Sequence, residues 1–447
     1  MICAARGLLA LPLATVLLAV SAPAALAHFI GPETLQITVD PNDPDRLWAR
    51  ATYGVLSSLD GGLTWDWICT AVAGYAAEDG GALAVLADGA VLSTSYGGVW
   101  RSPAGCAWSE PEPAIGRGVT GLSVDPQDPS RLVVLVSRAD GDAFESLLWE
   151  SSDSGASFQR LGVPLDTASV HQSLVQAPSD PSRLYVAGRL VENNEVLPLV
   201  RRSTDRAEAW QTTMLDLPPW AQPWIAGVHP TDPDRLYVAA DLAPEAGAEF
   251  VEGVLLFSDD GGLSFSEVVR RQTRVLAFSW SADGTRVAVG FGDPRSAAPV
   301  QVEDFGIYTA AEGSDAFSRV QAGHVACLSR IAGDLWACRD PNTSGFVISR
   351  SADDGASFVG VLELAGLRGP QACETGSETA QTCPLFWDAV CTETGKCEPE
   401  GDDDDSAVGP PDGCGCEQER ESVSLGLLAL FALMGQSRLR RRQTDID

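Results

Sequence analysis

Short apolar segments alternate with polar turns along most of the 447-residue chain. A representative segment, Leu236 to Ala240, follows a turn that contains His229 and Pro230. Segments of about four to eight residues that are rich in β-branched and aromatic residues and bounded by Gly, Pro and Asp are typical of β-strands. The hydrophobic pattern therefore predicts an all-β protein.

One turn recurs between these segments with the pattern Ser, any, Asp, any, Gly, any, Ser or Thr, aromatic. Complete copies occupy residues 58–65, 151–158, 258–265 and 351–358, and a degenerate copy at 203–210 has lost the glycine. The aspartate accepts backbone N–H bonds, the glycine adopts a conformation that a side chain forbids, and the hydroxyl closes a second local bond. The aromatic residue then begins the next strand. We call these copies the aspartate turns; their aspartates are Asp60, Asp153, Asp205, Asp260 and Asp353.

A second turn confirms that the chain is built from repeats. The sequence Asp43-Pro44-Asp45-Arg46-Leu47 returns in similar form at residues 128–132, 180–184 and 232–236. Proline presets the backbone angle that such a turn requires. With degenerate copies included, the two turns define seven units of about fifty residues, which begin near residues 35, 82, 120, 173, 225, 276 and 324. Six or eight units remain possible, because the second and sixth are inferred from weak copies.

The aspartate turn resembles the Asp-box of sialidase-like and sortilin-like β-propellers. In those families the Asp-box joins the third and fourth strands of a blade and is mainly structural, so the resemblance implies structural rather than catalytic or calcium-binding aspartates. We therefore predict a single seven-bladed β-propeller of four-stranded antiparallel blades over residues 28–365. A disulfide-rich module at 366–400 and an acidic linker at 401–413 follow it.

Both ends of the chain have the character of targeting signals. Arg6, an apolar run from Gly7 to Val20 and Ala25-Leu26-Ala27 predict a secretory signal peptide at 1–27. Residues 414–442 contain Cys414 and Cys416, a predicted hydrophobic helix and an arginine cluster, and they resemble the MYXO-CTERM sorting tag of Myxococcota. That resemblance implies processing near one of the cysteines by a dedicated membrane protease and anchoring at the cell surface, on the outer membrane. An ordinary membrane anchor is the alternative.

Eight further cysteines fit export, since an even number in a secreted chain indicates disulfides. We expect Cys69 to pair with Cys106, and Cys327 with Cys338, because each pair falls in adjacent blades or adjacent strands. Three connectivities are open for Cys373, Cys383, Cys391 and Cys397, which we expect to form their own module. Their spacing, without a nearby histidine, argues against zinc.

Charge limits the classes of partner. The net charge is −31, and Lys396 is the single lysine. Nucleic-acid binding needs a cationic surface, so we predict no nucleic-acid partner. We also expect no cofactor, no metal and a monomer.

The propeller topology separates the two repeated turns from the more irregular loops. Both turns fall on one face, whereas residues 139–145, 192–195, 240–252 and 293–304 and the connection at 218–224 fall on the other. Variable loops on a rigid scaffold commonly carry binding residues. The candidate ligand residues on this face are Trp220, Trp224, Asp140, Asp142, Glu249, Glu252 and Asp304. The alternative is that these carboxylates are solvated and the tryptophans cap the core.

No residue of the sequence is singled out as catalytic. Sialidases require an arginine triad, a tyrosine nucleophile and a Phe-Arg-Ile-Pro signature, and that signature is missing from this sequence. Xyloglucan-cleaving enzymes resemble the chain more closely, but their active site lies between two propellers. We therefore expect a binding module for an extracellular glycan or protein. A glycoside hydrolase acting on extracellular polysaccharide is the alternative, and a photosystem II assembly propeller, which needs a basic face, is the third.

Overall fold

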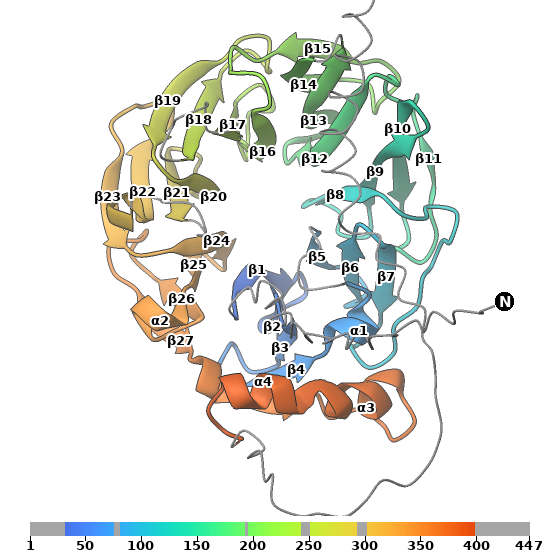
Figure 1. Ribbon diagram of the computed structural model, residues 1–447, viewed down its shortest axis with the longest axis vertical. Coiled ribbons are helices and arrows are strands. Elements are labelled where there is room, and N and C mark those ends of the chain that lie inside the picture. Colours follow the sequence, from blue (N-terminus) through green and yellow to red (C-terminus); the bar gives the residue numbers. More distant parts are fainter. Residues whose placement is uncertain (1–31, 76–80, 193–194, 243–250, 293–301, 398–447) are drawn as a thin grey trace, which may run out of the picture. The chain divides into compact units, whose positions relative to one another are not determined.

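A computed structural model describes residues 32–75, 81–192, 195–242, 251–292 and 302–397, all within one compact unit. Their strands form seven antiparallel sheets that follow one another around a ring, the blades of a β-propeller (Figure 1). The predicted fold is thus confirmed, and six or eight blades are excluded. The predicted signal peptide at 1–27, acidic linker at 401–413 and sorting tag at 414–442 lie outside the described residues.

Each blade is made of consecutive strands, with the first strand innermost (Figure 1). The first blade contains β1 (Thr34–Asp40), β2 (Asp43–Ala51), β3 (Gly54–Ser58) and β4 (Trp65–Ile68), and the second contains β5 (Leu83–Val85), β6 (Val91–Ser95) and β7 (Gly98–Ser102). The third blade contains β8 (Val119–Val124), β9 (Leu132–Asp140), β10 (Ala143–Ser151) and β11 (Gln159–Leu161). The fourth contains β12 (Ser169–Ala177), β13 (Asp180–Glu192), β14 (Glu195–Ser203) and β15 (Gln211–Met214). In the second blade, an isolated bridge between Arg101 and Ser109 stands in the place of the fourth strand.

The remaining blades have four strands each. The fifth blade contains β16 (Gln222–Val228), β17 (Leu236–Leu242), β18 (Glu252–Ser258) and β19 (Ser266–Arg271). The sixth contains β20 (Arg274–Trp280), β21 (Arg286–Gly292), β22 (Gly306–Ala311) and β23 (Ser318–Ala322). The seventh contains β24 (Val325–Ile331), β25 (Asp334–Arg339), β26 (Ile348–Ser351) and β27 (Val359–Leu362). The short helices are α1 (Thr70–Ala73), α2 (Pro341–Ser344), α3 (Glu378–Thr382) and α4 (Trp387–Glu393), with 3-10 turns η1 (Val302–Asp304), η2 (Leu364–Gly366) and η3 (Cys383–Phe386).

The second strand of a blade is buried on both sides because each blade packs against two neighbours. In β17, all five residues from Leu236 to Ala240 are inaccessible to solvent. This double burial explains why the segment is continuously apolar instead of alternating with polar residues. The blade interfaces, rather than one central core, therefore contain most of the buried apolar surface.

The aspartate turns join the third and fourth strands and dock on the turn between the first and second strands. Asp260 accepts hydrogen bonds from the Ser258 hydroxyl at 2.8 Å, from the Ser264 backbone N–H at 3.0 Å and from the Ser264 hydroxyl at 2.6 Å. The Gly261 N–H then donates to the Asp234 carbonyl at 2.7 Å. The glycine of the pattern has a positive φ in all four complete copies, 92° at Gly62, 71° at Gly155, 80° at Gly262 and 93° at Gly355, which explains why glycine recurs there.

A C-terminal segment closes the ring from outside. Strand β28 (Leu367–Pro370) adds to the outer edge of the first blade, parallel to β4. Arg368 donates two hydrogen bonds to Asp66, at 2.8 and 2.6 Å. Trp387 packs on Trp67 with 5.3 Å between ring centroids. We call residues 367–397 the clasp.

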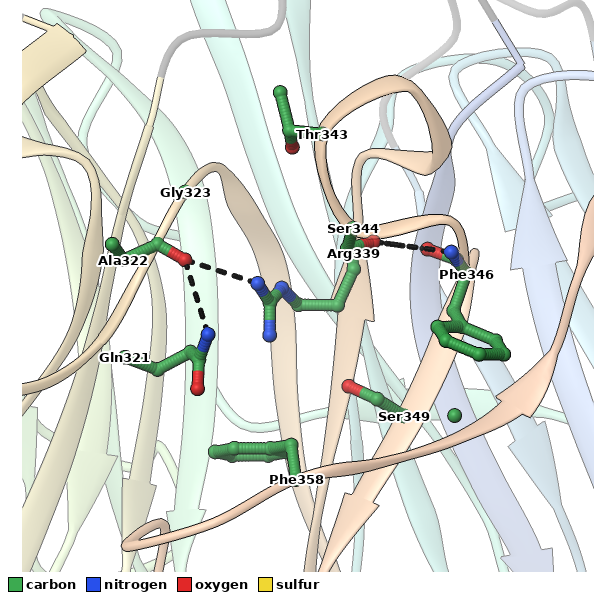
Figure 2. Close-up of a pocket in the computed structure, with 10 residues that line it drawn as sticks. Gln321, Ala322, Gly323, Arg339, Thr343, Ser344, Phe346, Ser349 and Phe358 are labelled. Carbon is green, nitrogen blue, oxygen red and sulfur yellow. Dashed lines mark hydrogen bonds between the residues drawn. The ribbon is translucent and has the colours of Figure 1, made fainter.

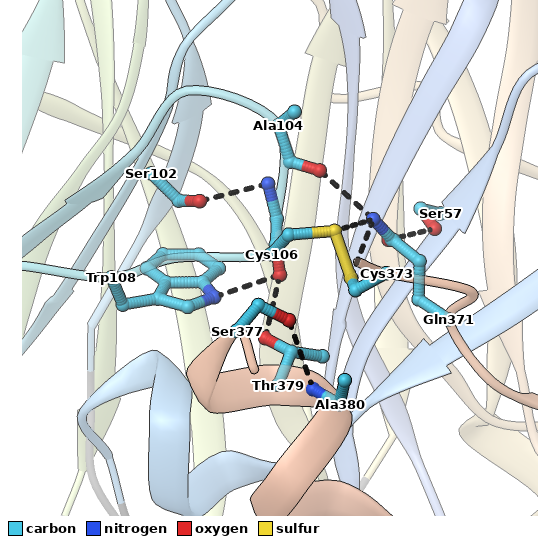
Figure 3. The surroundings of a disulfide bond; sticks show 11 residues. Ser57, Ser102, Ala104, Cys106, Trp108, Gln371, Cys373, Ser377, Thr379 and Ala380 are labelled. Carbon is cyan, nitrogen blue, oxygen red and sulfur yellow. Dashed lines mark hydrogen bonds between the residues drawn. A yellow bond between two sulfur atoms is a disulfide. The ribbon is translucent and has the colours of Figure 1, made fainter. Parts of the chain in front are cut away.

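Two disulfides join the clasp to the propeller. Cys69 pairs with Cys383, and Cys106 pairs with Cys373. Figure 3 shows the second of these beside Gln371, whose amide donates to the Ala104 carbonyl at 2.8 Å and accepts from the Ser57 hydroxyl at 2.9 Å. The clasp therefore links the first and second blades covalently to the segment that follows the seventh blade.

The expected pairing of Cys69 with Cys106 is wrong, as is the idea of a self-contained module. The returning chain brings Cys373 and Cys383 against the first two blades, so each of these blade cysteines meets a distant partner instead of its neighbour. Cys391 and Cys397 do pair within the clasp. Cys327 pairs with Cys338 across β24 and β25, as the sequence predicts.

The clasp disulfides should stabilise the fold more than the local one. Cys69 and Cys383 are 314 residues apart, whereas Cys391 and Cys397 are 6 residues apart. A crosslink across a longer loop removes more entropy from the unfolded chain, so the Cys69→Ser/Cys383→Ser variant should lose about 2–5 kcal/mol of unfolding free energy. Urea unfolding followed by tryptophan fluorescence measures this loss. The matched Cys391→Ser/Cys397→Ser variant should lose less, and an equal loss would contradict the role of the clasp.

The turn carboxylates should make stability depend on acid. Hydrogen bonds from Ser357 and Ser351 lower the pKa of Asp353 to about 2, and those from Ser281 and Thr285 do the same for Asp283. Between about pH 4 and pH 2, these carboxylates stay ionised in the folded protein but bind protons in the unfolded chain. Proton binding then favours the unfolded chain, so the free energy of unfolding should fall progressively from about pH 4 toward pH 2. Urea midpoints measured from pH 7 to pH 2 test this. Asp353→Asn should flatten the dependence, and a profile parallel to that of the wild type would contradict the assignment.

Candidate functional site

A cavity of about 470 Å³ lies between the sixth and seventh blades. Its volume is within the range of about 300–1,000 Å³ that small-molecule sites occupy. It extends from the loop that contains α2 to the beginning of β27, as Figure 2 shows. The lining residues are Gln321, Ala322, Gly323, Arg339, Thr343, Ser344, Phe346, Ser349, Phe358 and Gly360.

Arg339, the last residue of β25, provides the charge of this cavity. Its side chain is largely buried, with 5% of the residue exposed. One guanidinium nitrogen, Nη2, donates to the Ala322 carbonyl at 3.0 Å, and Figure 2 shows the group reaching toward that carbonyl. The guanidinium carbon also lies 6.0 Å from the centre of the Phe358 ring. Burial lowers the pKa of Arg339, and the neighbouring Asp340 opposes that effect.

Part of the hydrogen-bonding capacity of Arg339 is unused. Its Nε atom is buried and has no hydrogen-bond partner among the described residues. The ten residues that line the cavity include no aspartate or glutamate. A buried cation without an anionic partner is costly, since burial removes the water that would solvate its charge. The cavity therefore contains a positive group whose charge is only partly compensated, by the neighbouring Asp340.

Hydroxyl and amide groups complete the polar lining. The Ser349 hydroxyl is buried and, among the described residues, has no hydrogen-bond partner. The Ser344 hydroxyl donates to the Phe346 carbonyl at 2.7 Å. Among the described residues, the Gln321 amide makes one long contact, 3.5 Å to the Ala322 carbonyl, so its N–H groups are available to another acceptor.

The local sequence explains the rim of the cavity. Asp340 begins α2 by accepting a hydrogen bond from the Asn342 N–H at 2.9 Å, and Pro341 occupies the first helical position. Gly345, with a φ of 77°, ends the turn and directs the chain toward Phe346. At Gly360, a Cβ atom would approach the Phe346 ring to 2.0 Å. Glycine at this position is therefore required for the ring to line the cavity.

Register comparison with the other blades shows that Arg339 is unusual. Arg339 pairs with Val325, the residue just before a bulge in the innermost strand. The equivalent positions of five other blades carry Ala51, Val136, Gly188, Val238 and Phe291. An arginine thus replaces a small or apolar residue in the seventh blade. Aligning the repeats by register would have revealed this signal, which our reading of the turns alone missed.

Two segments that we expected to be long loops are tight hairpins. Residues 139–145 belong to β9 and β10, with Asp140 paired to Ala143. Residues 192–195 join β13 and β14, with Glu192 paired to Glu195. That expectation is wrong, because the strands extend to the turn itself. Asp140 and Asp142 consequently sit exposed at a hairpin tip.

The other predicted ligand residues are dispersed over the loop face. Trp220 is 48% exposed in the connection to the fifth blade, whereas Trp224 is half-buried in β16 and packs on the core cluster that contains Tyr237. Glu252 forms an ion pair with Arg270, at 2.8 Å. Asp304 ends η1, and Glu249 lies outside the described residues. None of the described candidates lines the cavity.

Neither a metal-binding cluster nor a membrane-spanning helix is found among the residues that the structure describes. No group of three or more His, Cys, Asp or Glu side chains there is arranged to hold a metal ion. Within the same residues, no helix is both long enough and apolar enough to cross a membrane.

Comparison with known proteins gives only distant structural similarities. No protein-family model matches the chain, and the curated proteins give no match. A GH74 xyloglucanase from Xanthomonas campestris is 16% identical over 72% of this chain and 59% of its own length, with a TM-score of 0.42. A GH93 α-L-arabinofuranosidase of Fusarium graminearum is 14% identical over 62% of this chain and 91% of its own, with a TM-score of 0.38.

An extracellular domain of a putative one component system from B. thetaiotaomicron is similar too. It is 10% identical over 72% of this chain and 38% of its own length, with a TM-score of 0.45. The chain thus spans 59% of the xyloglucanase and 38% of this domain. Since identity is at most 16% and all three TM-scores are below 0.5, no property and no site residue is transferred from these proteins.

Proposed function

We propose that this chain is a non-catalytic binding module for an extracellular ligand, and that the cavity between the sixth and seventh blades is its binding site. The observation that supports this proposal is the lining of that cavity, which combines hydroxyls, an amide, a guanidinium and two aromatic rings. Sites of this composition bind small polar molecules, because the rings contact apolar faces while the polar groups fix the orientation.

The same lining argues against hydrolysis at this position. Glycoside hydrolases use two carboxyl groups about 5–10 Å apart, one as an acid and the other as a base or nucleophile. No carboxyl group is among the cavity-lining residues. A glycan is therefore favoured as a ligand rather than as a substrate, and a protein ligand would require a flatter surface of about 800 Å².

We propose that this binding function operates outside the cell. We propose that residues 1–27 direct export and that the 414–442 segment is processed near Cys414 or Cys416 by a sorting protease. The propeller would then be held at the outer membrane by its C-terminus. Four disulfides in the described part of the chain support an oxidising compartment.

Glycan binding without turnover is the expected outcome of a direct test. The purified chain should bind members of an array of neutral and acidic glycans and should release no reducing ends from the bound polysaccharides. Phe346→Ala should weaken binding about tenfold, since it removes apolar contact worth about 1.5 kcal/mol. Trp220→Ala is the matched control, because Trp220 is an exposed aromatic residue outside the cavity.

Three results would contradict the proposal. Protein-dependent release of reducing ends would favour the glycoside hydrolase instead. Binding lost in Trp220→Ala but retained in Phe346→Ala would move the site to the connection at 218–224. Failure of the folded chain to bind any glycan would remove the proposed function.

A further inference from the structure

We propose that the cavity between the sixth and seventh blades binds a carboxylate-bearing sugar, whose carboxylate pairs with the guanidinium of Arg339. The inference rests on the binding function proposed above and specifies the class of ligand. Its basis is the combination of a buried, incompletely bonded guanidinium with a cavity of about 470 Å³.

A second buried arginine, Arg201, shows one way in which this protein satisfies such a group. Arg201 is 8% exposed and donates to His171, Thr212, Asp166 and Ser169. Arg339 is buried to a similar degree, yet the structure gives its side chain one hydrogen bond, from Nη2 to the Ala322 carbonyl. A guanidinium has five N–H donors, and they match a carboxylate in geometry and charge. An anion in the cavity would supply the partner that Asp166 supplies to Arg201.

The remaining lining favours a sugar as the carrier of that carboxylate. The buried Ser349 hydroxyl lacks a partner within the described residues, and Gln321 has an available amide. Both groups suit the hydroxyls of a sugar ring. Phe346 and Phe358 offer partly exposed rings for its apolar face. A peptide carboxylate shares the charge but makes less use of these hydroxyl and amide groups.

Net charge does not oppose this binding at short range. The chain carries −31 overall, which repels anions at a distance. At physiological ionic strength, however, that repulsion is screened beyond about 8 Å. The ten residues that line the cavity include no aspartate or glutamate that would repel a carboxylate at close range. Contact with Arg339 therefore decides the interaction.

The test compares two sugars that differ at one group. Glucuronate carries a carboxylate where glucose carries a hydroxymethyl group, so calorimetric titration of each into the full chain isolates the contribution of charge. Glucuronate should bind more tightly than glucose. Arg339→Met, which keeps the alkyl stem beside Phe358, should weaken glucuronate binding at least about tenfold, as expected for a lost charge-assisted hydrogen bond. Arg339→Lys should restore part of the affinity.

A matched variant controls for the loss of a positive charge in the same blade. Arg350 lies on β26 and contacts Asp334 at 3.4 Å, outside the cavity. Arg350→Met should therefore leave glucuronate binding unchanged. The comparison of glucuronate with glucose needs no variant, so it remains decisive even if Arg339→Met fails to fold.

Several outcomes would overturn the inference. These are equal affinity for glucose and glucuronate, unchanged glucuronate binding in Arg339→Met, and tighter binding of N-acetylglycine, a model of a peptide carboxylate, than of glucuronate. If Arg339→Met binds the neutral glycans of the array as well as the wild type does, and also binds glucuronate unchanged, the binding function stands and only the anionic ligand is refuted. If no glycan of any charge binds, the proposed function fails as well.

Discussion

The rest of this structure depends on closure of the ring. Every blade buries apolar residues against two neighbours, so the first and last blades would expose theirs if they did not meet. Strand β28, which follows the seventh blade, joins the outer edge of the first blade. The two blades also meet directly: the Ser329 hydroxyl on β24 donates to the Ile37 carbonyl on β1 at 2.8 Å, and His324 contacts Glu33 in a buried pair. One hydrophobic cluster joins Ile37 of the first blade, Trp336 of the seventh and Cys383 of the clasp. The clasp thus adds covalent and apolar contacts at the point where the chain must return to its beginning.

The repeated turns form many of their hydrogen bonds within their own blade, although Arg202 and Thr213 of the fourth blade also donate to the aspartate turn of the fifth. An aspartate turn satisfies its own polar groups locally and docks on the first turn of the same blade through one backbone hydrogen bond, as Gly61 does on Asp45 and Gly261 on Asp234. Because these bonds are internal to a blade, the turns act as scaffold. We therefore place the proposed ligand site at a position where one blade differs from the others. Arg339 is such a position, since five register-equivalent residues are small or apolar.

The cavity also lies at a structurally informative place. It forms between the last two blades, where the loop with α2 separates β25 from β26 and where Gly323 and Gly360 keep side chains out of the space. A rigid ring holds both walls, so the proposed ligand would meet preorganised groups and little ordering of the protein would be required. This arrangement favours selective recognition of a small chemical group over broad contact with a large partner.

Sequence by itself determined the architecture, since the turns that define the blades are local. Each aspartate turn requires only eight consecutive residues, and its recurrence together with the Asp-Pro turns predicts seven blades and their starts, with β5 at Leu83 and β24 at Val325 close to the expected 82 and 324. The structure then excludes six or eight blades. Tertiary structure decided everything that joins distant segments. Cys69 meets Cys383 and not Cys106, because the returning chain covers the first blade. The carboxylates of the loop face disperse, while Arg339, Ser349 and Gln321 converge. The hydrogen bonds of a turn depend on residues that are close in sequence. A cavity instead depends on how two blades pack, and no local sequence pattern determines that packing.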